Sequence, residues 1–202
     1  MDLMAVPESV RLLERQLRDI FTTRLLSLVV YRPATVATAA LLHTVVTVDQ
    51  ITLEDLQACA ARAGGWHAQG LATPLILEAR EFDRSLDAFP LEFGAILADH
   101  ELVLGTDPFA GLSVDAEDLR RACEVQVRSH LLHLREGFIE TRGETAALVS
   151  LLVDSVAPLA GLVVSVPRLL GQPTRQPDAA ARLVEQTASL PAGSLGDVLI
   201  RS

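Results

Sequence analysis

Three charged side chains spaced four residues apart are the first candidates for chemistry. Arg120, Glu124 and Arg128 lie in a stretch with helical periodicity, so this spacing places them on one face of a helix. Two guanidinium groups on one face could bind a small anionic ligand in a cleft, with the carboxylate between them fixing their orientation. The same spacing is typical of a salt-bridge ladder on a solvated helix face. The residues alone leave both interpretations open.

The second half of the chain predicts the helices that would carry this face. Acidic residues over 115–118 favour a helix start, because the helix dipole stabilises negative charge there. A long helix is expected from Asp115 to about Thr141, and a second over 145–171. A third begins with Asp178 as its cap. We therefore expect an antiparallel helical bundle.

The first half mixes strand and helix patterns, whereas the residues after about 112 show helical patterns. We accordingly predict two domains, 1–112 and 113–202. Apolar, β-branched runs indicate strands buried on both faces. A threonine followed three residues later by an acid indicates a capped helix start. The expected elements are a helix over 7–24, strands over 25–31 and 41–48, a helix from Thr52 to the Gly64-Gly65 pair, strand-like segments over 74–82 and 89–98, and exposed turns around His100 and over 105–108. A turn to helix near Ile96 is the alternative for the segment 89–98.

The strand-turn-strand layout of residues 25–49 resembles the opening of a nucleotidyltransferase domain. Over about residues 20–170 the chain resembles a group of uncharacterised bacterial nucleotidyltransferase-like proteins with a C-terminal helical segment. The resemblance implies an α+β fold, with a small mixed nucleotidyltransferase-like sheet and flanking helices followed by an antiparallel helical bundle. The more specific part of the resemblance is carried by the runs 85–93, 103–109, 119–128 and 131–138.

The resemblance also implies where catalytic groups would stand. In such a domain a Gly-Ser turn holds the triphosphate, and an Asp-x-Asp pair on the second strand holds the metal. Here Arg32-Pro33 occupies the place of the turn, and Pro33 lacks a backbone donor. Leu41 and His43 occupy the places of the aspartates, and these two residues are a poor magnesium site. We therefore expect neither a metal nor a cofactor, and no catalytic residue.

A third carboxylate of the family pattern falls near Glu92, with Asp87 as the alternative. Alone, such a carboxylate cannot hold a two-metal arrangement. Our main hypothesis is a catalytically degenerate nucleotidyltransferase-like protein that acts by ligand or partner binding. The ligand-binding candidates are Asp87, Glu92, Arg120, Glu124 and Arg128.

Two enzymatic alternatives remain open. One is an active nucleotidyltransferase with a non-standard site built from Asp87, Glu92 and the Arg120 face. The other is a ribonuclease, because Arg128 and His133 match the Arg-x4-His form seen in HEPN ribonucleases.

Composition excludes some classes of partner. The chain has 202 residues with 17 basic and 26 acidic side chains, a formal charge of −9, and no basic cluster, so we expect no nucleic-acid binding. Cys59 and Cys123 are far apart and lie among apolar neighbours, which favours free thiols in a reducing cytoplasm.

The stretch 146–166 is long enough to span a bilayer, with Asp154 as its single charge. A carboxylate near the centre of a membrane is costly. We therefore expect a bundle helix that is buried or faces a partner, with membrane contact unlikely, and a homodimer or a complex with another protein.

Overall fold

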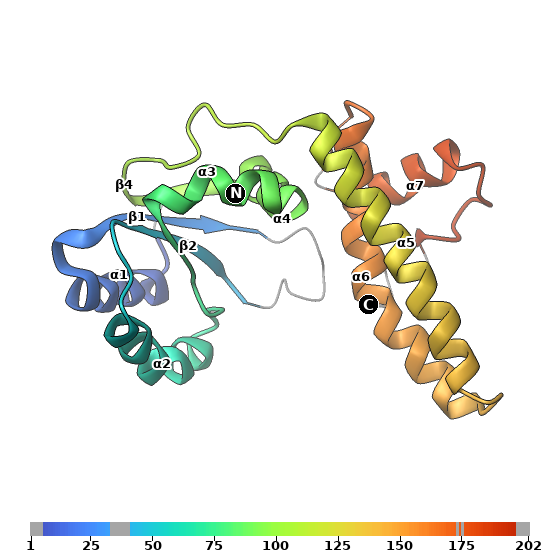
Figure 1. Ribbon diagram of the computed structural model, residues 1–202, viewed down its shortest axis with the longest axis horizontal. Helices are drawn as coiled ribbons and strands as arrows, with labels where there is room; N and C mark the ends of the chain where they lie inside the picture. The colour runs from blue at the N-terminus through green and yellow to red at the C-terminus, as the bar shows by residue number, and fades with distance from the viewer. Residues whose placement is uncertain (1–5, 33–40, 173, 175, 197–202) are drawn as a thin grey trace. The chain divides into compact units, whose positions relative to one another are not determined.

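The computed structural model describes residues 6–32, 41–172, 174 and 176–196. The chain divides into two compact units, which we treat separately. The sheet unit is built mainly from residues up to Ser113, and the helical unit contains Phe89–Gly94 and the chain from Val114 onward. The α+β fold class expected from the sequence is confirmed (Figure 1).

A four-stranded mixed sheet forms the centre of the sheet unit. Its strands are β1 (Leu25–Tyr31), β2 (His43–Val48), β3 (Leu75–Glu78) and β4 (His100–Gly105), in the order β3-β2-β1-β4. Strand β1 pairs antiparallel with both β2 and β4, while β2 and β3 run parallel. The two central strands are buried on both faces, as their β-branched runs predict.

Two helices cover one face of this sheet, α1 (Glu8–Phe21) and α2 (Leu53–Ala68) (Figure 1). A short 3-10 turn, η1 (Thr22–Arg24), connects α1 to β1. One hydrophobic core joins the two helices to alternate residues of the central strands, as period-two alternation requires. Its fully buried members include Leu13, Leu17, Phe21, Leu28 and Val46.

The start of α2 agrees with the sequence, but its end does not. Thr52 and Asp55 form a capping box, each side chain accepting from the other residue's backbone N–H. The helix was expected to end at Gly64-Gly65, yet it continues to Ala68. A Cβ at either glycine would meet no atom within 4 Å, so neither is required by close packing. The helical hydrogen bonds outweigh the modest cost of two glycines.

The segment after β3 departs further from the sequence-based expectation. The region 74–82 is a strand only over β3, followed by η3 (Ala79–Glu81) and α3 (Phe82–Ala88). The predicted strand over 89–98 is wrong, because Pro90–Ala98 forms the helix α4. Proline at a first helical position is favourable, since its missing N–H has no helical partner there. Strand β4 replaces the turn expected around His100.

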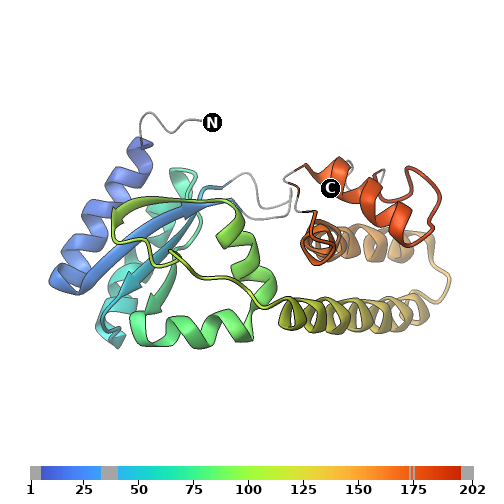
Figure 2. The ribbon, with the colours of Figure 1, turned by 90° about the horizontal axis from the view of Figure 1, so that it is seen from above.

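The helical unit contains α5 (Ala116–Glu140), α6 (Thr145–Leu169) and α7 (Pro177–Thr187). Helices α5 and α6 lie side by side and antiparallel, and α7 packs on α6 (Figures 1 and 2). Asp115 caps α5 by accepting from two backbone N–H groups, as expected. Asp178 is not a cap but lies in the first turn of α7, after Gln176 at the N-cap.

Helix α6 is the one helix of the described chain that is long and apolar enough to cross a membrane. Length and composition are weak evidence, because a core helix of a soluble protein can pass the same test. The C-terminal part of α6 packs against α7 through Ala160, Val163 and Val164, in contact with Ala180 and Ala181.

Candidate functional site

Three ring-bearing side chains form a row across the strands at one end of the sheet. Tyr31 on β1 is paired in register with His43 on β2 and with His100 on β4. Cross-strand partners point to the same face of a sheet. The rings of Tyr31 and His43 lie 5.5 Å apart, centre to centre. The two imidazoles lie on either side of the tyrosine, so about 10 Å of sheet separates their strands.

Charged groups flank this row on the β4 side. The Arg32 guanidinium lies 3.4 Å from the Asp99 carboxylate. The His100 ring faces two acceptors, with Nδ1 3.0 Å from the backbone oxygen of Ile96 and Nε2 3.3 Å from Asp107. Both acceptors receive a hydrogen bond only when the ring carries both protons. We call Tyr31, Arg32, His43, Asp99, His100 and Asp107 the strand-end cluster.

Burial sets the chemistry of the tyrosine in this cluster. Desolvation raises the pKa of the Tyr31 phenol, so the hydroxyl stays neutral at physiological pH. Phe109 packs 4.9 Å from the His100 ring and limits its motion. The cluster can therefore offer hydrogen bonds and ring surfaces, but its carboxylates each face a basic side chain. Among the described residues, no group of three or more His, Cys, Asp or Glu could hold a metal ion.

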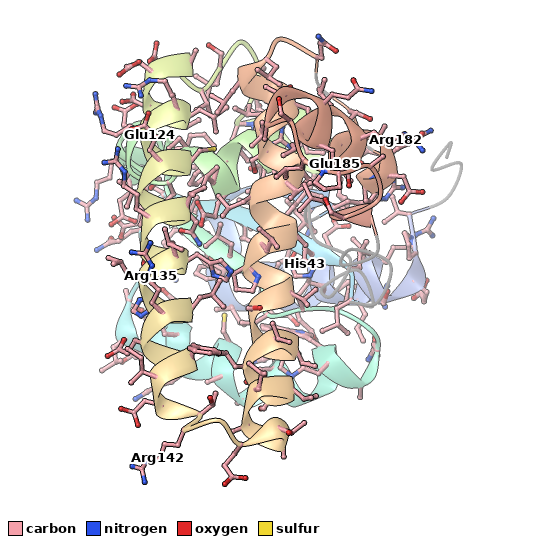
Figure 3. The ribbon with its side chains drawn as sticks, turned by 90° about the vertical axis from the view of Figure 1, so that its right-hand side faces the viewer. His43, Glu124, Arg135, Arg142, Arg182 and Glu185 are labelled. Atoms are coloured by element: carbon pink, nitrogen blue, oxygen red, sulfur yellow. The ribbon has the colours of Figure 1, made fainter. Side chains whose placement is uncertain are left out.

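His43, labelled in Figure 3, stands at the position where the resemblance places the second aspartate of the metal-binding pair. Leu41, at the first position, is partly exposed and lies just before the strand. Arg32 directly follows β1, and Pro33 lies outside the described residues. Tyr31, His100 and Asp107 were not predicted as site residues, because only the pairing of β1 with β4, and the contact of His100 with Asp107, bring them together.

Glu78 is the one acidic residue on β3, the strand that pairs in parallel with β2. It pairs in register with Val48, at the far end of β2 from His43, a separation of about 16 Å along the strand. Its oxygens accept from the backbone N–H of Ile51 and from Arg80. These hydrogen bonds, that from Ile51 first, lower the pKa of Glu78. The side chain fixes a turn and does not face the strand-end cluster.

Asp87 and Glu92 do not occupy strand positions. Asp87 is exposed on α3, and Glu92 is exposed in the first turn of α4. Because the segment expected as a strand over 89–98 is helical, Glu92 does not stand on the sheet. An acid in a first helical turn is favoured by the helix dipole. Both residues remain ligand-binding candidates only as surface groups.

A salt-bridge ladder lies on one face of α5, but it joins Glu117, Arg120 and Glu124 and does not include Arg128. Arg120 donates to both oxygens of Glu117, at 2.6 and 2.9 Å, and it also contacts Glu124. The hydrogen bonds to Glu117, and then the nearby negative charges, raise the pKa of Arg120. All three side chains are about half exposed. Glu117 was missed because it was assigned only to the helix start.

Arg128 is exposed on the same helix and has no ion-pair partner among the residues that the structure describes. His133 is also exposed, with Nδ1 3.6 Å from Glu136. The ribonuclease alternative thus has both of its residues on the surface of α5.

Both cysteines are free and buried. Desolvation raises the pKa of the Cys59 and Cys123 thiols, which keeps them protonated and unreactive. They stabilise the two units by packing.

Comparison with known proteins identifies the fold and no more. No protein-family model matches the sequence, and no curated protein matches it. Among solved structures, the chain is similar to spectinomycin adenyltransferase AAD(9) from Enterococcus faecialis, solved with ATP and spectinomycin. The TM-score is 0.59 at 13% identity, over 96% of this chain and 87% of that one. The fold is therefore nucleotidyltransferase-like.

Proposed function

We propose that this chain is a catalytically degenerate nucleotidyltransferase-fold protein that acts by binding a ligand or a partner. The observation that carries the proposal is at the start of β2: Leu41 and His43 stand where the resemblance calls for metal-binding carboxylates, and the His43 ring lies beside that of Tyr31. Neither ring can replace two carboxylates around Mg²⁺, which requires oxygen ligands in near-octahedral geometry.

The positions of the remaining acids support the same conclusion. The Glu78 carboxylate accepts a hydrogen bond from the Ile51 N–H, at the end of the β2–β3 pair opposite to His43. Asp99 and Asp107 each face a basic side chain. Metal ions supply most of the charge stabilisation in phosphoryl transfer. Without ligands for them, nucleotidyl transfer from this sheet would lose most of its rate.

The strand-end cluster is the ligand site that this proposal favours over the α5 ladder. Arg120 already binds two carboxylates, so an anion at that face must compete with both. The cluster offers a phenol, two imidazoles and the Arg32 guanidinium at one end of the sheet, and the single Arg32–Asp99 ion pair, at 3.4 Å, is longer than the 2.6 Å contact of Arg120 with Glu117. The alternative of an active nucleotidyltransferase predicts magnesium-dependent nucleotide binding, which makes the two hypotheses separable.

The test is isothermal titration of the protein with ATP, GTP, CTP and UTP, each with and without Mg²⁺. We expect no magnesium-dependent binding at micromolar strength, and no transfer of AMP from ATP to spectinomycin. Magnesium-dependent micromolar binding by the natural sequence would overturn the proposal.

A matched pair of variants tests the assigned positions. The double variant Leu41→Asp/His43→Asp places two carboxylates at the start of β2 and should gain Mn²⁺ binding, measured by the paramagnetic relaxation of water protons. The Leu41→Asn/His43→Asn variant has nearly the same shape without the charge and should not. If the two variants behave alike, the assignment of these positions is wrong.

The ribonuclease alternative has its own readout. Cleavage of single-stranded RNA that is abolished by His133→Ala would support it, whereas we expect no cleavage by the unaltered chain.

A further inference from the structure

The guanidinium of Arg168, near the C-terminal end of α6, has a buried nitrogen without a hydrogen-bond partner. Its Nη1 atom is sealed from solvent and makes no hydrogen bond within the part of the chain that the structure describes. Three hydroxyls and one imidazole nitrogen share this condition. A hydroxyl can rotate and an imidazole can stay neutral, whereas an arginine keeps its charge. Arg168 is therefore the unpartnered buried group whose state costs the most.

The neighbours of Arg168 in the helical unit offer packing but no negative charge. An added Cβ at Gly94 would lie 3.4 Å from Nη1 of Arg168 and 3.9 Å from the Val114 side chain. Desolvation lowers the pKa of Arg168, and the one side chain whose charge would oppose this is Cys123 on α5. Burial raises the pKa of the Cys123 thiol, so it stays neutral. The cation thus lies against backbone and apolar groups without a counter-charge among the described residues.

The acidic side chains of the surrounding elements are directed elsewhere. Asp115 accepts from two backbone N–H groups at the start of α5, and Asp118 pairs with an arginine of its own helix. Glu92 lies two residues before Gly94 on α4, so about 200° of rotation around the helix axis separates them. Within the described ranges, no carboxylate forms an ion pair with Arg168.

Solvent reaches the rest of the Arg168 guanidinium. Its Nε and Nη2 atoms also have no hydrogen-bond partner in the described part of the chain, yet neither is sealed from solvent. An anion can therefore approach the side chain from outside. The terminal nitrogens of a guanidinium lie in one plane and donate in parallel to two oxygens of a carboxylate or a phosphate. Binding in this way would give Nη1 the acceptor that it lacks.

We infer that Arg168 anchors a ligand site in the helical unit that binds a small oxyanion, a carboxylate or a phosphate group. The guanidinium supplies both the charge and the planar pair of donors, and Gly94 leaves room beside Nη1 because it has no side chain. The site needs no metal ion, since the arginine itself neutralises the anion. It shares no residue with the strand-end cluster, so it can be present or absent whatever that cluster binds.

Thermal melting of the helices, followed by far-ultraviolet circular dichroism, measures this binding. The protein is melted in chloride, in inorganic phosphate and in acetate, at equal pH and ionic strength. For a dissociation constant of about 1 mM, about 10 mM anion should raise the melting temperature by about 3–6 °C. A rise with phosphate alone assigns a phosphate group, a rise with acetate alone assigns a carboxylate, and a rise with both assigns the shared oxyanion chemistry. No rise with either anion would overturn the proposal.

Arg168→Met removes the charge and keeps an unbranched side chain. Its melting temperature in chloride should equal or exceed that of the natural sequence, because an unpaired buried charge is gone, and the rise with the anion should disappear. The matched control is Arg128→Met, at an exposed position on α5, which should keep the full rise. An equal rise in Arg168→Met and Arg128→Met would contradict the assignment.

Arg168→Lys tests the planar pair of donors, and it also serves if the methionine variant does not fold. Lysine keeps the positive charge but binds an anion as a point charge. We expect the dissociation constant for the anion to rise at least about threefold, by isothermal titration in chloride buffer. An unchanged dissociation constant in Arg168→Lys would overturn the proposal as well.

Discussion

The two units of this protein differ in how much of their apolar surface they bury. In the sheet unit, α1 and α2 seal one face of the strands, and Val29 and Val45 on the other face are also fully buried. In the helical unit, Ala160 and Val163 of α6 are buried against α7, whereas Val149 and Val153 earlier on the same helix are 54% and 65% exposed. A closed unit is stabilised by its own core, whereas an open one gains from a partner. The sheet unit therefore buries its apolar strand surface with its own helices, whereas the helical unit leaves part of its apolar helix surface exposed.

The largest expected effect comes from breaking the ion pair that closes the sheet unit. Arg24 donates to both oxygens of Asp55, at 2.6 and 2.8 Å, and Asp55 is 5% exposed. Asp55→Ala removes this pair and the half of the capping box in which the Asp55 carboxylate accepts from the Thr52 N–H, and it should destabilise the sheet unit by about 3–5 kcal/mol in urea unfolding. The control is Glu54→Ala, an exposed neighbour, which should stay within about 0.5 kcal/mol.

The same ion pair predicts an acid dependence. The hydrogen bonds from Arg24 hold the pKa of Asp55 well below its usual range. A carboxyl group whose folded pKa is depressed contributes stability above its unfolded pKa of about 3.9, and that stability is lost as the pH falls further. The melting temperature should therefore fall below about pH 4, and the fall should be shallower in Asp55→Ala. An equal slope in both proteins would contradict the assignment.

The next effect tests how tightly β4 is fitted to β1. Gly105 has φ +81°, and an added Cβ would lie 1.9 Å from the backbone oxygen of Leu26. Gly105→Ala should cost about 3 kcal/mol, because it combines left-handed strain with a clash against backbone. Gly111 has φ +78° with open space around it, so Gly111→Ala should cost only about 1 kcal/mol. Equal losses would mean that the strand edge is able to shift.

The smallest effect lies in the helical unit. Glu185 accepts from the backbone N–H groups of Gly193 and Leu195, at 3.0 and 2.7 Å. These hydrogen bonds lower the pKa of the Glu185 carboxyl group, and the bond from Gly193 has the largest effect. Glu185→Gln weakens two acceptors and should speed hydrogen exchange over 191–196 without changing unfolding of the sheet unit. Glu136→Gln, at an exposed site on α5, should leave that exchange unchanged.

Much of the architecture could be read from local patterns, and the errors have common physical causes. The strands β1 and β2 and the capped starts of α2 and α5 agree with prediction because β-branched runs and capping residues act over a few positions. The segment 89–98 was assigned as a strand because a short apolar run has no decisive period. Pro90 was the available signal for a helix start.

The candidate site was harder to predict because it depends on strand register. The sequence alone gives no sign that His100 belongs to a site, because it becomes a neighbour of Tyr31 only through the pairing of β1 with β4. Glu117 was likewise visible but assigned a single role. In both cases the residue types were readable, and the missing information was which side chains become neighbours in space.

The Arg24–Asp55 pair also has a consequence for the order of folding. Arg24 immediately precedes β1 and Asp55 follows β2, so the pair joins positions 31 residues apart across the whole β1–β2 hairpin. Loop-closure entropy disfavours this contact until the two strands are side by side. Asp55 also accepts from the backbone and hydroxyl of Thr52, so the same carboxylate fixes the first turn of α2. Helix α2 is thus locked in place after the hairpin that precedes it, which couples completion of the sheet to completion of its cover.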